Sequence, residues 1–291
     1  MNRLSVNSSS EFEPACGLAN HAVDHLIAAT TTPMNHTTYH NFIPAETSPG
    51  QTRSPACSDI SCEHVDKSAT RDTHHRRPLI NMRDITKLAT LNCRSLNSGW
   101  KQGELTAEAK RLNLAAVGIQ EHRIQCEDDL RHLDVGGGWR FVHASADKQG
   151  NGGVGLLMSP RTYASLDAAH LISQRILRFT FTCQNKRQRK SHPKLDIIVC
   201  YSPTSVSSDP DIESFYSDMQ NTVDSTGRHA FLAILGDWNA RLKTSALSPW
   251  VYSNSPNRNS AQFSDFLSAN ELFSSNTIFR KRLSRLYTHR G

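Results

Sequence analysis

The sequence predicts an α/β fold, because short apolar runs typical of buried strands alternate with amphipathic stretches typical of helices. The clearest run, residues 230–235, ends at Gly236-Asp237-Trp238-Asn239, and an apolar run bounded by a turn signal favours a buried strand. A strand, a helix and a second strand are expected between residues 86 and 120, which is the pattern of a β-α-β unit. The length of 291 residues allows one large α/β domain plus a tail.

The N-terminal part, residues 1–83, is predicted to be a disordered segment. It is rich in Ser, Thr, Pro, Asn and His and poor in Val, Ile and Leu, so it cannot bury enough apolar surface to offset its ordering entropy. Cys57, Cys62 and His64 lie within it, but their spacing fits no standard zinc finger. The folded domain is expected to cover residues 84–291.

Composition favours an intracellular protein without a membrane span. The net charge of +6 and the pI of about 9.0 favour polyanionic partners such as nucleic acid, although solubility alone accounts for a modest excess. Seven scattered cysteines, an odd number, indicate reduced thiols. No apolar stretch is long enough to span a bilayer, and the N-terminus lacks the apolar region of a signal peptide.

The first half of the folded region is expected to be built from strands and turns around one helix. Residues 86–92 alternate polar and apolar side chains, residues 104–114 have helical spacing, and residues 114–120 predict a buried strand whose apolar run ends at Gln120. Because the two strands of a β-α-β unit finish at the same edge of a sheet, Asn92 and Glu121 should lie close together. Two glycine-rich turns, residues 136–138 and 150–153, precede the strands expected at residues 139–142 and 154–158.

The second half adds two helices and three strands. The helix at residues 209–224 begins with Asp209 and Pro210, and proline suits a first helical turn. A basic run at residues 186–190 predicts an exposed hairpin loop. The remaining elements are strands at residues 176–183, 195–201 and 230–235, and a helix at residues 259–272.

Polar side chains recur directly after four of the predicted strands. They are Asn92, Glu121, Tyr201 and the pair Asp237 and Asn239, and sites in α/β sheets form outside strand ends. The spacing of two places Asp237 and Asn239 on one side, with the intervening tryptophan in the packing. These are hard oxygen donors, without a Ser-His-Asp order or a Cys/His cluster, which favours Mg²⁺ or Mn²⁺ and phosphate chemistry. The simpler interpretation of the last strand end is an Asp/Asn turn.

With these residues in place, the chain resembles the endonuclease/exonuclease/phosphatase superfamily, which includes DNase I, the apurinic/apyrimidinic endonucleases and the endonucleases of non-LTR retrotransposons. The resemblance runs from about residue 87 to residue 291, and its later motifs look most like retrotransposon endonucleases or host proteins derived from them (craniofacial-development-protein-like). The motifs that carry it, in order, are Leu91-Asn92-Cys93-Arg94-Ser95-Leu96, Ile119-Gln120-Glu121-His122-Arg123, Gly152-Gly153-Val154-Gly155-Leu156, Tyr201-Ser202-Pro203-Thr204, Gly236-Asp237-Trp238-Asn239-Ala240, Asn270-Glu271-Leu272 with Asn276-Thr277-Ile278-Phe279, and Tyr287-Thr288-His289-Arg290-Gly291.

The resemblance implies a four-layer α/β sandwich (DNase I-like) that hydrolyses DNA phosphodiesters with Mg²⁺ or Mn²⁺ in the nucleus. Glu121 would be the principal metal ligand, and Asn92 would help to hold the metal or orient the nucleophile. Tyr201 would contact the scissile phosphate. Asp237 would align or deprotonate the attacking water, and Asn239 would stabilise the developing negative charge.

Two closing motifs of the superfamily, a Gln-Ile-Asp-type strand and Ser-Asp-His, do not occur before Gly291. His289 comes too early and lacks a preceding Asp, so it is not assigned to the site. We therefore expect a C-terminally truncated fold with weak or no activity. Arg94 stands where repair-type members carry an acidic residue, which favours the retrotransposon branch.

Two other functions remain open from the sequence. One is a catalytically dead, truncated remnant that binds nucleic acid or a protein. The other is a phosphodiesterase of the same superfamily that acts on inositol phosphates or sphingomyelin, which the basic charge and the retrotransposon-like motifs disfavour. The sequence does not indicate an oligomeric state.

Overall fold

The computed structural model describes residues 29–31, 80, 86–183, 193–227, 230–245, 248–251, 255–278 and 280. These residues form two five-stranded sheets, with strand orders β2-β3-β6-β5-β4 and β1-β10-β9-β8-β7. Each sheet contains one parallel pair, β2 with β3 and β9 with β10, and the other neighbours are antiparallel. The strands are β1 (Ala29–Thr31), β2 (Leu88–Asn92), β3 (Ala116–Gln120), β4 (Leu130–Asp134), β5 (Arg140–Ala144), β6 (Val154–Met158), β7 (Leu166–Ser173), β8 (Ile176–Thr182), β9 (Lys194–Tyr201) and β10 (Phe231–Asp237).

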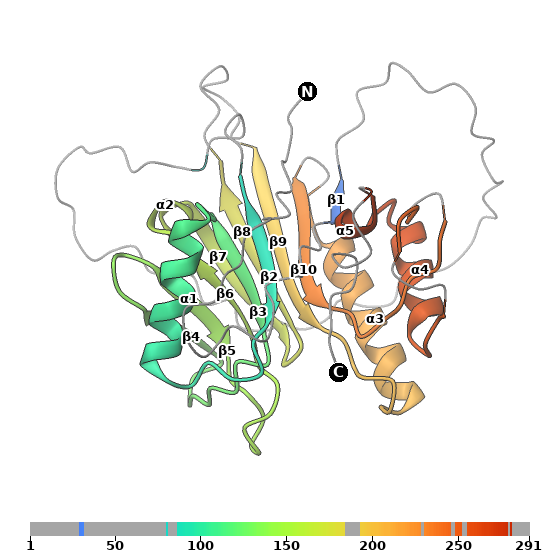
Figure 1. Ribbon diagram of the computed structural model, residues 1–291, viewed down its shortest axis with the longest axis horizontal. Coiled ribbons are helices and arrows are strands. Elements are labelled where there is room, and N and C mark those ends of the chain that lie inside the picture. The colour runs from blue at the N-terminus through green and yellow to red at the C-terminus, as the bar shows by residue number, and fades with distance from the viewer. Residues whose placement is uncertain are drawn as a thin grey trace.

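The sheets pack face to face and helices cover their outer faces, giving the predicted four layers (Figure 1). Buried side chains of both sheets share one apolar cluster between them. A second cluster joins the β2–β3 sheet to α1 (Gly99–Arg111). A third joins the β9–β10 sheet to α3 (Asp209–Asp224) and α4 (Ser260–Ala269). The predicted α/β sandwich class is therefore confirmed.

A glycine brings the two parallel pairs close together. Gly118 lies on β3, and a Cβ atom built there would lie 2.7 Å from Cβ of Leu235 on β10. A side chain at this position would push the sheets apart. The parallel strands of one sheet consequently end beside those of the other.

Helix α1 begins five residues earlier than the predicted start at Glu104. The amide of Gln102 donates to the carbonyl of Ser98 at 3.2 Å, and its side chain donates to the carbonyl of Leu96 at 2.9 Å. These bonds form the first helical turn ahead of the predicted start.

The same helix also ends earlier than predicted, at Arg111 rather than Leu114. Asn113 adopts a positive φ of 53°, and the amide of Leu114 donates back to the carbonyl of Ala109 at 2.9 Å. Asparagine tolerates this left-handed conformation better than most residues, so it closes the helix.

Five elements were not predicted, namely β1, α5 (Ser275–Ile278) and the three described next. Strand β4, the short helix α2 (Pro160–Ala164) and strand β7 complete the two sheets and the connection between them. β4 carries charged residues on its exposed positions and β7 bulges against β8, so neither has the clear alternation that identifies a strand.

The other elements agree closely with prediction. α3 has the predicted bounds, and Pro210 lies in its first turn after the N-cap Ser208. The glycine-rich stretch at residues 150–153 forms the β5–β6 turn, in which Asp147 Oδ1 accepts the amide of Asn151 at 2.6 Å. The predicted helix at residues 259–272 is shorter, ending at Ala269, and α5 (Ser275–Ile278) follows it.

Parts of the N-terminal segment contact the fold. Ala29–Thr31 pairs antiparallel with β10, and Ile80, four positions before the expected domain start, is buried in the cluster between the sheets. The remaining residues of the segment up to 79, the Cys57-Cys62-His64 group, the basic run at residues 186–190 and the C-terminal residues 281–291 lie outside the described residues. The division at residue 83 stays a prediction.

Among the described residues, no helix combines the length and the apolar character that crossing a membrane requires. The four cysteines of the described part, Cys93, Cys126, Cys183 and Cys200, are free thiols.

Candidate active site

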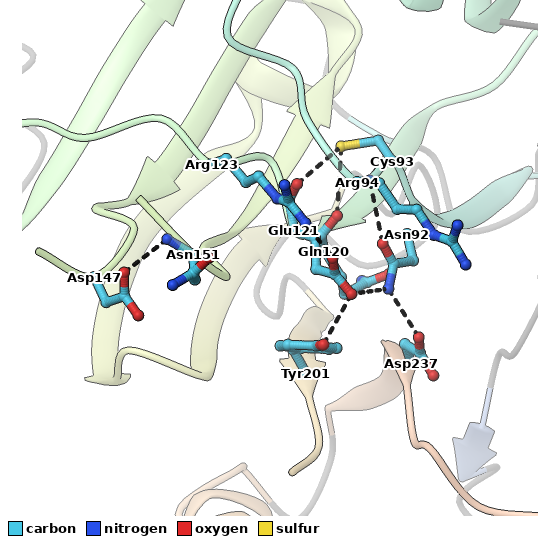
Figure 2. Close-up of polar contacts among 10 residues, drawn as sticks. All are labelled: Asn92, Cys93, Arg94, Gln120, Glu121, Arg123, Asp147, Asn151, Tyr201 and Asp237. Atoms are coloured by element: carbon cyan, nitrogen blue, oxygen red, sulfur yellow. Dashed lines mark hydrogen bonds and ion pairs between the residues drawn. The ribbon is translucent and has the colours of Figure 1, made fainter. Parts of the chain in front are cut away.

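The polar residues predicted at four strand ends lie together at one edge of the sandwich. Asn92 Nδ2 donates to Glu121 Oε1 at 2.7 Å and to Asp237 Oδ2 at 3.0 Å, and the hydroxyl of Tyr201 donates to the same Glu121 oxygen at 2.8 Å. Figure 2 shows these four side chains pointing toward one another. They come from β2, the residue after β3, the end of β9 and the end of β10. The two parallel pairs therefore deliver one polar cluster.

Glu121 lies in a strained loop directly after β3. Its φ is +54°, and Arg123 two residues later has a φ of +58°. Left-handed backbone is costly for residues other than glycine and persists where surrounding contacts enforce it. The amide of Arg123 donates to the carbonyl of Gly152 at 3.0 Å, so the β5–β6 turn holds this loop in place.

His122 fixes the inner side of the same loop. It is fully buried, and its Nδ1 accepts the amide of Ile124 at 3.0 Å. A Cβ atom at Gly153 would collide with its ring, so only glycine leaves room for the imidazole. Burial and the neighbouring His143 lower the pKa of His122 to about 3. A neutral imidazole thus anchors the backbone from which the Glu121 side chain extends.

The Asp237 loop follows the sequence prediction closely. Trp238 is buried and stacks on Phe263 with ring centroids 4.4 Å apart. Asp237 Oδ1 accepts the amide of Asn239 at 3.1 Å, and Asn239 Nδ2 donates to the carbonyl of Ser202 at 2.9 Å. Asp237 and Asn239 therefore share one side, with the tryptophan in the core.

Gly236 brings β10 against β9 rather than bending the chain. The strand continues to Asp237, pairing Gly236 with Cys200 and Asp237 with Tyr201. A Cβ atom at Gly236 would lie 2.7 Å from the carbonyl oxygen of Cys200. The close approach sets the spacing between the Tyr201 and Asp237 side chains.

Tyr201 is held as a neutral donor. Burial, its hydrogen bond to Glu121 and the negative charges of Glu121 and Asp237 raise the pKa of the phenol above its ordinary value. Arg175, in the β7–β8 turn, lies over the Tyr201 ring at 5.4 Å and donates to the Tyr201 carbonyl at 3.3 Å. This arginine has no signal in the sequence, because the turn that carries it was not predicted.

Cys93, beside the cluster, is a poor nucleophile. Its thiol donates to the carbonyl of Gln120 at 3.4 Å, and burial raises its pKa to about 12. Only thiolates attack or bind metals effectively. The groups at this edge that can bind or react are therefore the carboxylates, the phenol and the side-chain amides, and not the thiol.

The cluster has two carboxylates, Glu121 and Asp237, that could bind a cation. Among the residues that the structure describes, no group of three His, Cys, Asp or Glu could hold a metal. Glu121 Oε1 already accepts two hydrogen bonds, whereas Oε2 has Arg123 Nη2 at 3.5 Å. Asn92 Oδ1 accepts the amide of Arg94 at 3.2 Å, so the amide nitrogen of Asn92 faces the carboxylates. In this arrangement Asn92 joins the carboxylates and does not present an oxygen to the space between them.

Comparison with known proteins identifies relatives of part of the chain. No protein-family model matches it. Craniofacial development protein 2 from Tragulus javanicus and from Bos taurus is 26% identical over 205 residues, which are 69% of this chain and 33% and 32% of those proteins. The chain thus spans about a third of the length of these curated relatives. They fit the craniofacial-development-protein-like resemblance that the motifs predict.

Two of the solved structures that the chain matches are described as endonucleases. The endonuclease domain of TRAS1, a telomere-specific non-LTR retrotransposon, is 18% identical, with 63% of this chain and 70% of that chain covered and a TM-score of 0.43. The AP endonuclease LMAP from Leishmania major is 14% identical, with 64% and 66% covered and a TM-score of 0.47.

Proposed function

We propose that this chain is a divalent-metal-dependent phosphodiesterase, and that it cuts DNA as an endonuclease of the retrotransposon type. The observation that carries the proposal is the joining of Glu121 and Asp237, from different sheets, through the amide of Asn92. Tyr201 adds a neutral hydroxyl donor to the same carboxylate. Carboxylates, an amide and a phenol around one point suit binding and hydrolysis of a phosphate ester.

The donor set fits a hard cation. Two carboxylates that share one N–H₂ group repel each other, and a divalent ion between them would offset that repulsion. Glu121 Oε2 is the oxygen best placed to bind it, since Oε1 is saturated by Asn92 and Tyr201. Ligation by Asn92 Oδ1 would require the amide to rotate and give up three hydrogen bonds. We therefore assign Glu121 as principal ligand and Asn92 mainly as the residue that orients the carboxylates.

The remaining residues have separate tasks in an in-line attack by water. A bound Mg²⁺ would supply Lewis acidity at the phosphoryl oxygens. Asp237 would align the water and accept its proton, and Asn92 holds this carboxylate in place. Asn239 uses one N–H on the carbonyl of Ser202 and keeps the second for an anionic oxygen. The hydroxyl of Tyr201 would donate to a non-bridging phosphate oxygen.

Exposed basic side chains near these strand ends suit a polyanionic substrate. Arg94 follows β2, Arg123 follows Glu121, and Arg175 lies against Tyr201. Together with the net charge of +6 they support DNA over a neutral or lipid substrate. The motifs that follow Asp237 support the retrotransposon branch, and with it a site of action in the nucleus.

Nicking of supercoiled plasmid tests the proposal. The wild-type chain should convert plasmid to the open-circular form with Mg²⁺ and not with EDTA. Glu121→Ala and Asp237→Ala should each reduce the rate on the order of 100- to 1000-fold. Equally intact plasmid with the wild type and both variants would favour the catalytically dead alternative, and hydrolysis of phosphoinositides without nicking would favour the lipid-acting one.

A further inference from the structure

An asparagine at the start of α4 does not perform the usual task of that position. Asn259 is the N-cap residue, but its side chain makes no capping hydrogen bond to the helix. Its Nδ2 instead donates to the carbonyl of Pro203 at 2.8 Å and to the carbonyl of Asn239 at 3.2 Å. The residue is fully buried. Asparagine is favoured at N-caps because its side-chain oxygen accepts hydrogen bonds from helix amides. Here the side chain instead donates hydrogen bonds to two loops.

A second asparagine acts on the same carbonyl. Asn257 Nδ2 donates to the carbonyl of Asn239 at 2.7 Å, while its Oδ1 accepts the amide of Arg241 and the hydroxyl of Ser260. The Asn239 carbonyl thus receives two side-chain amides. Asn239 has a φ of +46°, and such backbone persists only when its surroundings enforce it. These two amides provide that enforcement.

The loops held in this way carry or directly follow three residues of the candidate site, Tyr201, Asp237 and Asn239. Pro203 lies two residues after Tyr201, and Asn239 lies two residues after Asp237. The loops also contact each other directly, because Ser202 donates its amide to the Asp237 carbonyl at 2.9 Å and accepts from Asn239 Nδ2. The side chain of Asn259, which belongs to neither loop, donates hydrogen bonds to both of them from the start of α4.

We propose that Asn257 and Asn259 are positioning residues that lock the ends of β9 and β10 to the start of α4, and so set the geometry of Tyr201, Asp237 and Asn239. This inference rests on the proposed function for its effect on rate. We call the hydrogen bonds from the Asn257 and Asn259 amides the clamp. Without the clamp, the Asn239 loop can leave its left-handed conformation. The Asp237 carboxylate, which accepts the Asn239 amide, then loses its fixed orientation. A displacement of about 1 Å in a reacting group can cost on the order of 100-fold in rate.

Four variants separate positioning from folding. Asn259→Ala removes the side-chain amide, and Asn259→Asp keeps the size but cannot donate when ionised. Asn257→Ala removes the second donor at a less buried position. Asn270→Ala is the matched control, since Asn270 lies at the other end of α4 and its amide donates to Gln220 and to Phe266, away from the site.

Two measurements on the full chain are then compared. Plasmid-nicking kinetics should show kcat lowered about 10- to 100-fold in both Asn259 variants, less in Asn257→Ala, with KM changed less than about threefold. Hydrogen exchange of the Ser202 amide, which is bonded to the Asp237 carbonyl, should be at least about 10-fold faster in the Asn259 variants. Asn270→Ala should match the wild type in both nicking kinetics and Ser202 exchange, even if its melting temperature falls as much as that of the Asn259 variants.

The outcomes distinguish the clamp from the function on which it rests. Unchanged Ser202 exchange in both Asn259 variants would overturn the inference, as would equal acceleration in Asn270→Ala. The wild type could fail to nick plasmid while Ser202 exchange is still faster in the Asn259 variants than in Asn270→Ala. In that case the proposed function is wrong and the structural clamp stands.

Discussion

Asn92 and Asp237 lie 145 positions apart, on strands of different sheets, and the amide of Asn92 donates to Asp237 Oδ2 at 3.0 Å. The same nitrogen donates to Glu121 Oε1 at 2.7 Å. One amide group therefore bridges two carboxylates across the space between the sheets. The candidate site exists only when both sheets are assembled, so its geometry reports on the packing of the whole sandwich.

Asn92→Asp should make stability depend strongly on Mg²⁺. The substitution replaces the bridging donor with a third carboxylate, and three close negative charges disfavour the folded state. We expect a melting temperature below that of the wild type in EDTA, and a larger rise on adding Mg²⁺, because a cation that binds only the folded state stabilises it. Thermal unfolding with and without Mg²⁺ checks this. A rise no larger than that of the wild type would show that the added carboxylate does not strengthen cation binding at this cluster.

Tyr201→Phe should lower the nicking rate about 10-fold without altering its dependence on pH. Burial and Glu121 raise the pKa of Tyr201 above its ordinary value of about 10. The phenol therefore stays protonated below pH 10. Removing it takes away a hydrogen-bond donor that is present at every pH in this range, so the shape of the profile should not change. A rate profile from pH 6.5 to about 9.5 for both proteins checks this. An alkaline loss of activity that is present in the wild type and absent in the variant would contradict it.

Gly236→Ala should destabilise the chain and impair the site together. The added methyl group would meet the backbone carbonyl of Cys200, which cannot move without separating β9 from β10. We expect a loss of about 1–3 kcal/mol in the free energy of unfolding. Gly103→Ala is the control, because Gly103 lies within α1 with open space around its Cβ position. There alanine should be neutral or stabilising by up to about 1 kcal/mol. Equal free energies of unfolding for the two variants would disprove the close approach.

Acid should destabilise the fold through the buried pair His122 and His143. Burial and His143 lower the pKa of His122 to about 3, and burial, with Arg131 and His132 on β4, lowers the pKa of His143. An unfolded histidine binds a proton below about pH 6.5 while the folded one resists it. The free energy of unfolding should therefore fall as pH decreases from about 6.5 toward 4.

Urea unfolding in EDTA across this range measures the slope. His143→Phe should flatten it, because phenylalanine removes one titrating group while keeping a ring beside Phe141. His132→Gln, at an exposed position, should change the slope much less, because His132 is the smallest of the causes that lower the pKa of His143 and burial is the largest. A wild-type slope that His143→Phe leaves unchanged would assign the acid sensitivity to other groups.

Much of the fold was predictable because its central strands have unambiguous patterns. β3 and the last five residues of β9 are mainly apolar on both faces, and a polar residue marks the end of each. The order of these strand ends in the sequence predicts that Asn92, Glu121, Tyr201, Asp237 and Asn239 lie together. Their convergence follows from parallel pairing, which puts successive strand ends at one edge.

The features that were missed depend on tertiary contacts. Arg175 contacts Tyr201 from a turn between two strands, one of which has too irregular a pattern to identify. Asn259 resembles an ordinary helix cap in the sequence, and only the paths of two distant loops show that its amide is used elsewhere. The orientation of the Asn92 amide likewise depends on the backbone of Arg94.

The most direct test of the central claim is the anomalous diffraction of Mn²⁺ in crystals of the wild-type chain and of Glu121→Gln. The glutamine variant keeps an oxygen that accepts from Asn92 and Tyr201 but removes the charge that should hold the ion. The account predicts a single strong peak within about 2–2.5 Å of Glu121 Oε2, beside Asp237, that is absent from Glu121→Gln crystals soaked in the same solution. A peak of equal height in both crystals, or no peak at this edge of the sandwich in the wild type, would contradict it.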